Sequence, residues 1–255
     1  MTSYSGRHAE LYDLFYADKP YPQEAAFVAQ CLQTYSDGST HRLLELACGT
    51  GSHALELEQL GYQIVATDYS EDMLHRARQK ATQKSSQVEF QLQNMTQLEL
   101  AGVPFDAAYC LFDSIGYVAT NAALTQVFRS VHKHLRAEGL FVFEFWHAAA
   151  MLRHYDPLRV RQWKTDQGTV LRLSETTLDY ARQVSNVLYS IYELKSDGSY
   201  SSLTELQVNR YFLVQEMDQF LTAGGFAPVK WFAGFSTQEN ISDETWHIVV
   251  VARRV

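Results

Sequence analysis

An apolar run at residues 43–47 ends in Cys-Gly-Thr-Gly, and a segment with helical spacing follows it directly. Glycines in such a strand-to-helix turn permit backbone angles that other residues avoid, and they let a ligand approach the main chain closely. The next apolar run, at residues 63–67, ends at Asp68, whose carboxylate can accept hydrogen bonds from both hydroxyls of a ribose. Together these features indicate a nucleoside-binding α/β fold. The alternative is a purely structural turn in which Asp68 caps the next helix.

Strand-like and helix-like segments alternate up to residue 145, which predicts a parallel sheet with helices on both faces. Beyond that point four strand-like segments follow one another without helices between them, which predicts an antiparallel insertion. One more helix and two final strands follow, and the absence of a helix between these strands predicts a terminal hairpin. The expected strands of the insertion and the hairpin lie at residues 159–163, 169–178, 184–194, 201–211, 228–233 and 246–252.

We therefore expect a Rossmann-like α/β fold with a seven-stranded, mostly parallel sheet that ends in a C-terminal antiparallel hairpin. A helical N-terminal leader precedes this sheet, and an antiparallel β insertion follows its fifth strand. The expected division is a helical lid at residues 1–41, a core at residues 42–145 and 213–255, and an insertion at residues 146–212. We expect the insertion to cover the active site or to form an interface.

Composition excludes several classes of partner. The chain has 21 Lys and Arg residues against 29 Asp and Glu residues, a formal net charge of −8 that disfavours nucleic acids and anionic membranes. Its 3 cysteines are too few for a disulfide scaffold or a zinc cluster. No apolar stretch is long enough to span a membrane, and no signal peptide is visible. We expect a cytoplasmic protein without a metal, and the aromatic share of 13% either fills the core or lines a pocket.

Two nucleoside cofactors fit the glycine turn, a nicotinamide dinucleotide and S-adenosylmethionine (SAM). Gly49, Gly51 and Ala54 also match the looser dinucleotide fingerprint. Three other features favour SAM: the acidic Glu45 before the turn, the Asn94-Met95 pair after the third expected strand, and the terminal hairpin. The open alternatives are a nicotinamide-dependent oxidoreductase and a protein that binds SAM without catalysis.

Four segments resemble motifs of the class I SAM-dependent methyltransferases. They are the glycine turn with its strand at residues 43–51, and residues 65–73, 105–113 and 135–140. Within that class, Tyr4-Ser-Gly6 and residues 11–14 are similar to the leader of the nucleotide-aminosugar N,N-dimethyltransferases. The Ala-Cys-Gly-Thr-Gly turn is shared with the glycine N-methyltransferase branch. One departure is Tyr117, which stands where the aminosugar enzymes commonly place a His.

The resemblance implies roles for ten cofactor-binding residues. Ala47, Gly49 and Gly51 would pass the methionine part of SAM, and Glu45 would orient its ammonium group. Asp68 would hold the ribose, and the adenine would contact the side chains of Tyr69, Met73, Asn94 and Met95. Leu111 would offer its backbone carbonyl near the sulfonium. Charge alone adds Tyr4 and Tyr12 as an aromatic lid over the cation.

Methyl transfer from a sulfonium is an in-line displacement, so the protein mainly aligns the reacting atoms in a dry pocket. The resemblance implies transfer to a nitrogen or oxygen of a small-molecule acceptor, with release of S-adenosylhomocysteine (SAH), by a monomer or homodimer. The candidate catalytic residues follow the fourth and fifth strands: Asp113 as an anchor, Tyr117 as a hydrogen-bonding group and His147 as a general base. The alternative roles are a cap of the following turn for Asp113, a packing aromatic residue for Tyr117 and a solvent-facing histidine for His147.

Overall fold

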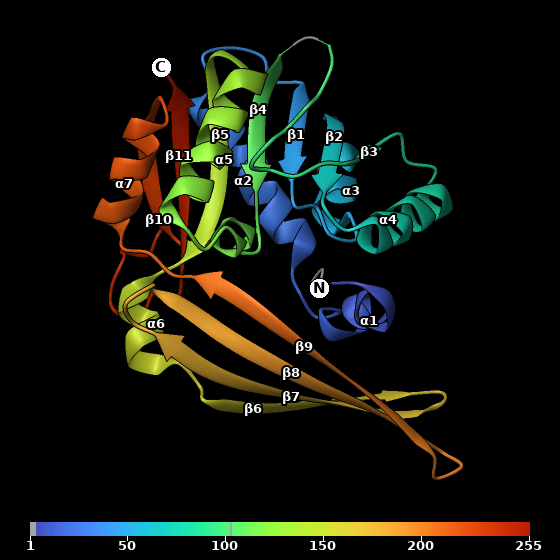
Figure 1. Ribbon diagram of the computed structural model, residues 1–255. Coiled ribbons are helices and arrows are strands. Elements are labelled where there is room, and N and C mark those ends of the chain that lie inside the picture. The colour runs from blue at the N-terminus through green and yellow to red at the C-terminus, as the bar shows by residue number, and fades with distance from the viewer. Residues whose placement is uncertain (1–3, 103) are drawn as a thin grey trace.

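The computed structural model describes residues 4–102 and 104–255, so the first three residues of the expected leader lie outside the described residues. A seven-stranded sheet forms the centre (Figure 1), in the order β10-β11-β5-β4-β1-β2-β3. All its pairs are parallel except those of β11, which is antiparallel to β5 and to β10. The strands are β1 Arg42–Leu46, β2 Gln63–Asp68, β3 Glu89–Leu92, β4 Phe105–Cys110, β5 Leu135–Trp146, β10 Phe226–Ala233 and β11 His247–Arg254.

Helices cover both faces of this sheet. The helices α2 (Tyr21–Tyr35), α3 (Ser52–Gln59) and α4 (Glu71–Lys84) share one buried core with it, and α5 (Asn121–His134) and α7 (Val214–Ala223) share the other. The apolar positions of β5 are buried nearly throughout, as a sheet covered on both faces requires. No described helix is both long and apolar enough to cross a membrane. The predicted Rossmann-like fold is confirmed.

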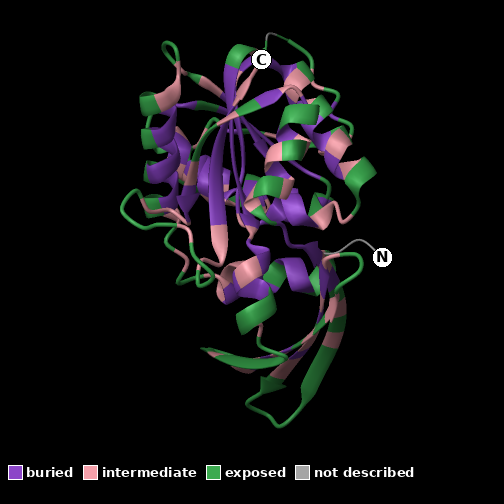
Figure 2. Cartoon of the chain, turned by 90° about the vertical axis from the view of Figure 1, so that its left-hand side faces the viewer, coloured by how far each residue is buried: buried purple, intermediate pink, exposed green. Residues whose placement is uncertain are grey.

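A second sheet follows α6 (Ala148–His154), in the order β6-β7-β8-β9 and antiparallel throughout. Its strands are β6 Leu158–Thr165, β7 Gly168–Asp179, β8 Val184–Lys195 and β9 Tyr200–Arg210, close to the predicted bounds. Leu11 and Phe15 of the leader helix α1 (Gly6–Phe15) pack against Val170 and Ile191 on its inner face. Much of its outer face is exposed (Figure 2), including Leu188 of β8.

Two short elements, α6 and the 3₁₀ helix η1 (Ser114–Tyr117), are not predicted by the sequence pattern. Segments of seven and four residues are too short to show helical periodicity.

The strand order fixes where a ligand can bind. The chain runs from β1 out to β3 and returns on the other side of β1 with β4, so the winding direction reverses between β1 and β4. In open α/β sheets, ligands bind beyond the carboxyl ends of the strands at such a reversal. The segments that leave β1 and β4, residues 47–51 and 111–117, therefore form the first place to look for a site.

Candidate functional site

The turn after β1 has an unusual backbone. Ala47, Gly49 and Gly51 have φ values of +51°, +56° and +76°, in the left-handed region. A Cβ on Gly51 would lie 2.8 Å from the Phe90 ring and 3.2 Å from Cβ of Ala77. The glycine at this position is therefore required both by its backbone angle and by the close approach of its neighbours.

Asp68, at the end of β2, lies beside this turn. One carboxylate oxygen accepts the N–H of Gly49 at 2.8 Å, and the other accepts the N–H of Ser70 at 2.8 Å. The side chain is buried, and this burial raises its pKa against the opposing effect of the backbone N–H groups. Each oxygen keeps a lone pair after these bonds, so the carboxylate can still accept hydrogen bonds from a ribose.

Glu45 lies deeper, within β1, and is 2% exposed. Its Oε2 atom is buried without a hydrogen-bond partner, and burial raises the pKa of the carboxyl well above its ordinary value. The side chain lines a small pocket together with Tyr12, Ala47 and Leu111. A buried carboxylate oxygen without a partner calls for a cation or a donor, so this pocket fits an ammonium group such as that of SAM.

The other residues expected near an adenine follow β2 and β3. Met73 of α4 is buried beside the turn, and its Cε would lie 3.4 Å from a Cβ on Gly49. Tyr69 is 43% exposed. Asn94 is exposed after β3, and its side-chain oxygen accepts the N–H of Thr96 at 3.0 Å, while Met95 is partly buried against the core. Their predicted contacts with an adenine remain predictions.

The leader covers the turn and connects it to the insertion. Tyr12 packs beside Met73, within 4.0 Å of where a Cβ on Gly49 would lie. The hydroxyl of Tyr4 forms hydrogen bonds with the hydroxyl of Tyr117 and with the side-chain carbonyl of Gln207 on β9.

On the core side, Lys80 of α4 forms an ion pair with Asp13 of α1 at 3.0 Å. On the insertion side, Arg7 donates to Glu193 of β8. Helix α1 therefore connects α4 of the core to the sheet of the insertion.

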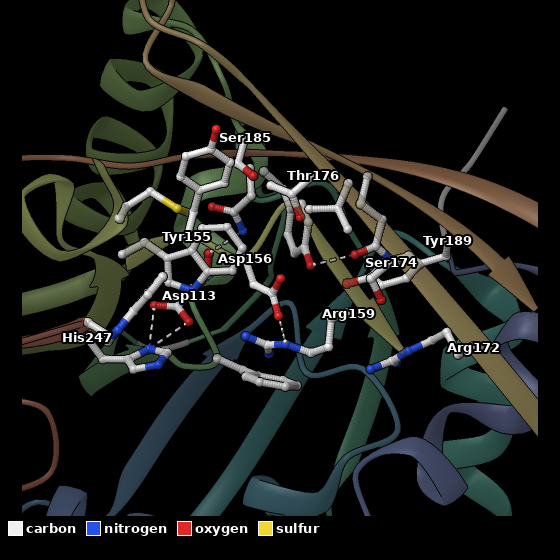
Figure 3. Close-up of a pocket in the computed structure, with 18 of the residues that line it drawn as sticks. Asp113, Tyr155, Asp156, Arg159, Arg172, Ser174, Thr176, Ser185, Tyr189 and His247 are labelled. Atoms are coloured by element: carbon white, nitrogen blue, oxygen red, sulfur yellow. Dashed lines mark hydrogen bonds and ion pairs between the residues drawn. The ribbon is translucent and has the colours of Figure 1, made fainter. Parts of the chain in front are cut away.

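A separate cavity of about 450 Å³ lies between the leader, the turn after β4 and the inner face of the insertion (Figure 3). Two predicted catalytic residues, Asp113 and Tyr117, line it. Phe112 lines both this cavity and the small pocket of Glu45, so the two spaces share a wall. His147 is not among the described residues that line the cavity, and its Nδ1 lies 3.2 Å from the carbonyl oxygen of Thr245.

A different histidine, which the sequence reading did not single out, faces the cavity. Nδ1 of His247, the first residue of β11, lies 2.9 Å from Oδ2 of Asp113. The Asp113 carboxylate raises the pKa of His247 to about 9. Asp113 in turn donates its backbone N–H to Oε1 of Glu144 at 2.9 Å. The position of His247 could have been inferred from the topology. A strand that is antiparallel to β5 begins at the edge of the sheet where the parallel strands end, and ligands bind at that edge.

Asp113, Glu144 and His247 bring three possible metal ligands within 4.8 Å of one another. Hydrogen bonds already occupy Nδ1 of His247 and Oε1 of Glu144. Burial and the Asp113 carboxylate raise the pKa of Glu144 to about 8, which favours its neutral form at neutral pH. The expectation that no metal takes part remains a prediction.

Comparisons with known proteins find similar methyltransferases. Residues 43–139 match the family model described as a methyltransferase domain. A putative methyltransferase of Geobacillus sp. (strain WCH70) is 28% identical over 95% of this chain and 96% of its own length. A dTDP-3-amino-3,6-dideoxy-alpha-D-glucopyranose N,N-dimethyltransferase of Streptomyces fradiae is 34% identical over 56% of this chain and 54% of its own. The sugar N-methyltransferase KedS8 from Streptoalloteichus sp ATCC 53650 superposes with a TM-score of 0.80 at 25% identity, covering 100% of this chain and 97% of its own.

Proposed function

We infer that this chain, which is a class I SAM-dependent methyltransferase resembling the aminosugar N,N-dimethyltransferases, methylates a small molecule. SAM is the methyl donor, and SAH is the product released. The acceptor atom that we propose is a nitrogen or an oxygen. The alternative of a nicotinamide-dependent oxidoreductase is not favoured, because the matched domain is a methyltransferase domain.

The observation that carries this proposal is the shared wall at Phe112. Phe112 lines both the pocket that fits the ammonium end of SAM and the 450 Å³ cavity, so the two spaces adjoin at this residue. An in-line displacement requires the acceptor and the donor to meet from opposite sides of the transferred carbon. Two adjoining spaces, one for the donor and one for the acceptor, allow this approach if they meet beside Phe112 when both are occupied.

We propose that twelve residues hold SAM. Asp68 would bind the ribose hydroxyls, and Glu45 would attract the ammonium group, since its buried Oε2 has no partner. Tyr4 and Tyr12 would close over the cation with the faces of their rings. The other residues in this set are Ala47, Gly49, Gly51, Tyr69, Met73, Asn94, Met95 and Leu111.

At the acceptor end, we propose that Asp113 and His247 act together. The carboxylate of Asp113 fixes the proton on Nδ1 of His247, so that in the neutral imidazole Nε2 is left to accept a proton in the cavity. As the nitrogen of the acceptor bonds to the methyl carbon and the carbon–sulfur bond breaks, that nitrogen would release a proton to Nε2. Tyr117, whose hydroxyl contacts Gln207 at 3.3 Å, would orient the acceptor. His147 lacks this access, so the predicted base role passes to His247.

We also propose that the protein works in the cytoplasm as a monomer or homodimer, without nucleic acid or membrane partners. Its net charge of −8 supports the exclusion of polyanions. The outer face of the insertion exposes Leu158, Val160, Leu188 and Leu206, which another copy would cover in a dimer. Sedimentation at several protein concentrations tests the assembly state.

Calorimetry with SAH and with NAD⁺ tests the proposed function. We expect saturable binding of SAH at one site per chain and no binding of NAD⁺. Turnover is then followed as SAH release from SAM in the presence of a panel of small amines and alcohols. Binding of NAD⁺ with no binding of SAH would contradict the proposal, and binding of SAH without turnover on any acceptor would favour a non-catalytic SAM-binding protein.

A further inference from the structure

Arg172, on β7, is a buried cation, and two of its three guanidinium nitrogens have no hydrogen-bond partner among the described residues. The residue is 5% exposed, and its Nε and Nη1 atoms have no partner in the part of the chain that the structure describes. It lines the 450 Å³ cavity, and Figure 3 shows its side chain well away from Asp113 and His247. Because burial without a counter-charge or an acceptor is costly for a guanidinium, its position needs an explanation.

A second arginine stands directly opposite. Arg161 of β6 pairs in register with Arg172, so both side chains project from the same face of the sheet. Arg161 also lines the cavity. No carboxylate of the described residues lies within ion-pair distance of either guanidinium. Like charges at directly opposed positions of an antiparallel pair repel each other, and the two arginines therefore create a site of unbalanced positive charge.

Aromatic rings surround the guanidinium of Arg172. Its Cζ lies 4.7 Å from the ring centroid of Phe15, 5.2 Å from that of Trp163 and 5.0 Å from that of Tyr189. These rings contact the guanidinium through cation–π interactions, which do not replace hydrogen bonds to Nε and Nη1. Ser174, on the same strand two residues away and also lining the cavity, adds a hydroxyl donor.

We propose that Arg161 and Arg172 bind an oxyanion of the acceptor, a carboxylate or a phosphate, at the opposite end of the cavity from the reacting atom. A planar guanidinium can donate two parallel hydrogen bonds to such a group. The acceptor is then a dipolar small molecule, with a nucleophilic nitrogen or oxygen near Asp113 and His247 and an anionic group near β6 and β7. This inference rests on the proposed function and specifies the substrate class of the same site.

The test measures anion binding to protein that has first been saturated with SAH. Inorganic phosphate, acetate and chloride are titrated at constant ionic strength, and binding is followed by tryptophan fluorescence and by the melting temperature. The variants are Arg172→Gln and Arg161→Gln, with Arg129→Gln on the exposed face of α5 as a matched control. Since Arg161 is exposed, its variant is expected to fold even if Arg172→Gln does not.

We expect phosphate or acetate to bind more tightly than chloride, and each cavity variant to weaken that binding at least about tenfold. Tighter binding of phosphate would indicate a phosphorylated acceptor, and tighter binding of acetate a carboxylate. Equal binding of all three anions, or an unchanged affinity in Arg161→Gln, would overturn the proposal. The titration is repeated without SAH. A failure of SAH to bind would count against methyl transfer, whereas anion binding without SAH tests the arginine site independently.

Discussion

Nδ1 of His247 lies 2.9 Å from Oδ2 of Asp113, although 134 residues separate the two in sequence. The pair joins the first residue of β11 to the turn after β4, and both residues line the 450 Å³ cavity. A carboxylate on one ring nitrogen fixes the tautomer and leaves the other nitrogen available. This relationship links the terminal hairpin, which lies far from the glycine turn in sequence, to the proposed chemistry.

Turnover is expected to depend on pH through the ionisation of His247. Because Asp113 raises the pKa of His247 to about 9, the neutral imidazole that accepts a proton accumulates only as pH rises toward that value. We expect kcat to rise with a limb near pH 9, to lose this limb in His247→Gln, and to show it at lower pH in Asp113→Asn. Single-turnover rates between pH 6 and 10 measure this. His154→Gln, on an exposed histidine of α6, is the control, and a limb that survives in His247→Gln would refute the role.

The same ion pair predicts a pH dependence of stability. The pKa of His247 is raised in the folded state, so the stability that the pair contributes is fully present below the unfolded value of about 6.5 and is lost as pH rises through about 9. We expect wild type to melt above His247→Gln at pH 6 and the two melting temperatures to converge by pH 10. Calorimetric scans across this range check it, and a constant difference would contradict the assignment.

Glu45→Gln is expected to affect the ligand-free and the SAM-bound protein in opposite directions. Burial raises the pKa of this carboxyl well above its ordinary value, so holding it ionised at pH 7 or above destabilises the fold. The amide removes that cost but also removes the charge that attracts the ammonium group. We expect a higher melting temperature without ligand and about tenfold weaker SAM binding. Glu239→Gln, on an exposed loop, should change neither quantity.

Gly51→Ala separates backbone strain from steric conflict when compared with Gly61→Ala. Both glycines have positive φ, but a Cβ on Gly51 meets the Phe90 ring at 2.8 Å, whereas one on Gly61 meets nothing within 4 Å. Strain alone costs about 1–2 kcal/mol, and overpacking adds about 1–3 kcal/mol. Urea unfolding should therefore show the larger loss for Gly51→Ala. Equal losses would mean that Phe90 moves aside freely.

Tyr117→Phe removes a hydroxyl that contacts Tyr4 and Gln207. If this hydroxyl orients the acceptor, kcat/KM should fall about tenfold while SAH affinity is retained. Steady-state kinetics with a working acceptor, together with SAH calorimetry, provide the measurement. Tyr180→Phe, 67% exposed in the insertion, is the control. Weaker SAH binding with unchanged kcat/KM would instead assign Tyr117 to the cofactor side.

The fold was predictable because its signals are local. Apolar runs, helical spacing and glycine turns recur within each unit of the parallel sheet, and the Asp197-Gly198 turn marks the hairpin of β8 and β9. The cofactor end of the site could be predicted for the same reason, since Glu45, Gly49 and Asp68 lie at or near the ends of successive strands. Their positions can be predicted without knowing which strands that are distant in sequence pair with each other.

The acceptor end depends on distant pairing and was not predictable in detail. Arg161 and Arg172 meet through the register of β6 with β7, and a shift of one residue would point one of them to the opposite face. His147 was the natural choice because it follows a parallel strand, but its ring turns to the Thr245 carbonyl. His247 occupies the edge instead, since β11 enters the sheet opposite Trp146.

Helix α1 contacts Lys80 on the core and Glu193 on the insertion, and Tyr4 just before it reaches Tyr117 and Gln207. The same short segment thus covers the glycine turn and forms part of the acceptor cavity wall. If the leader moves aside to admit the donor, that wall is lost at the same time, and we therefore expect the acceptor to bind only after the leader has closed. The expected kinetic order is compulsory, with SAM bound first and SAH released last, and product inhibition by SAH competitive with SAM alone.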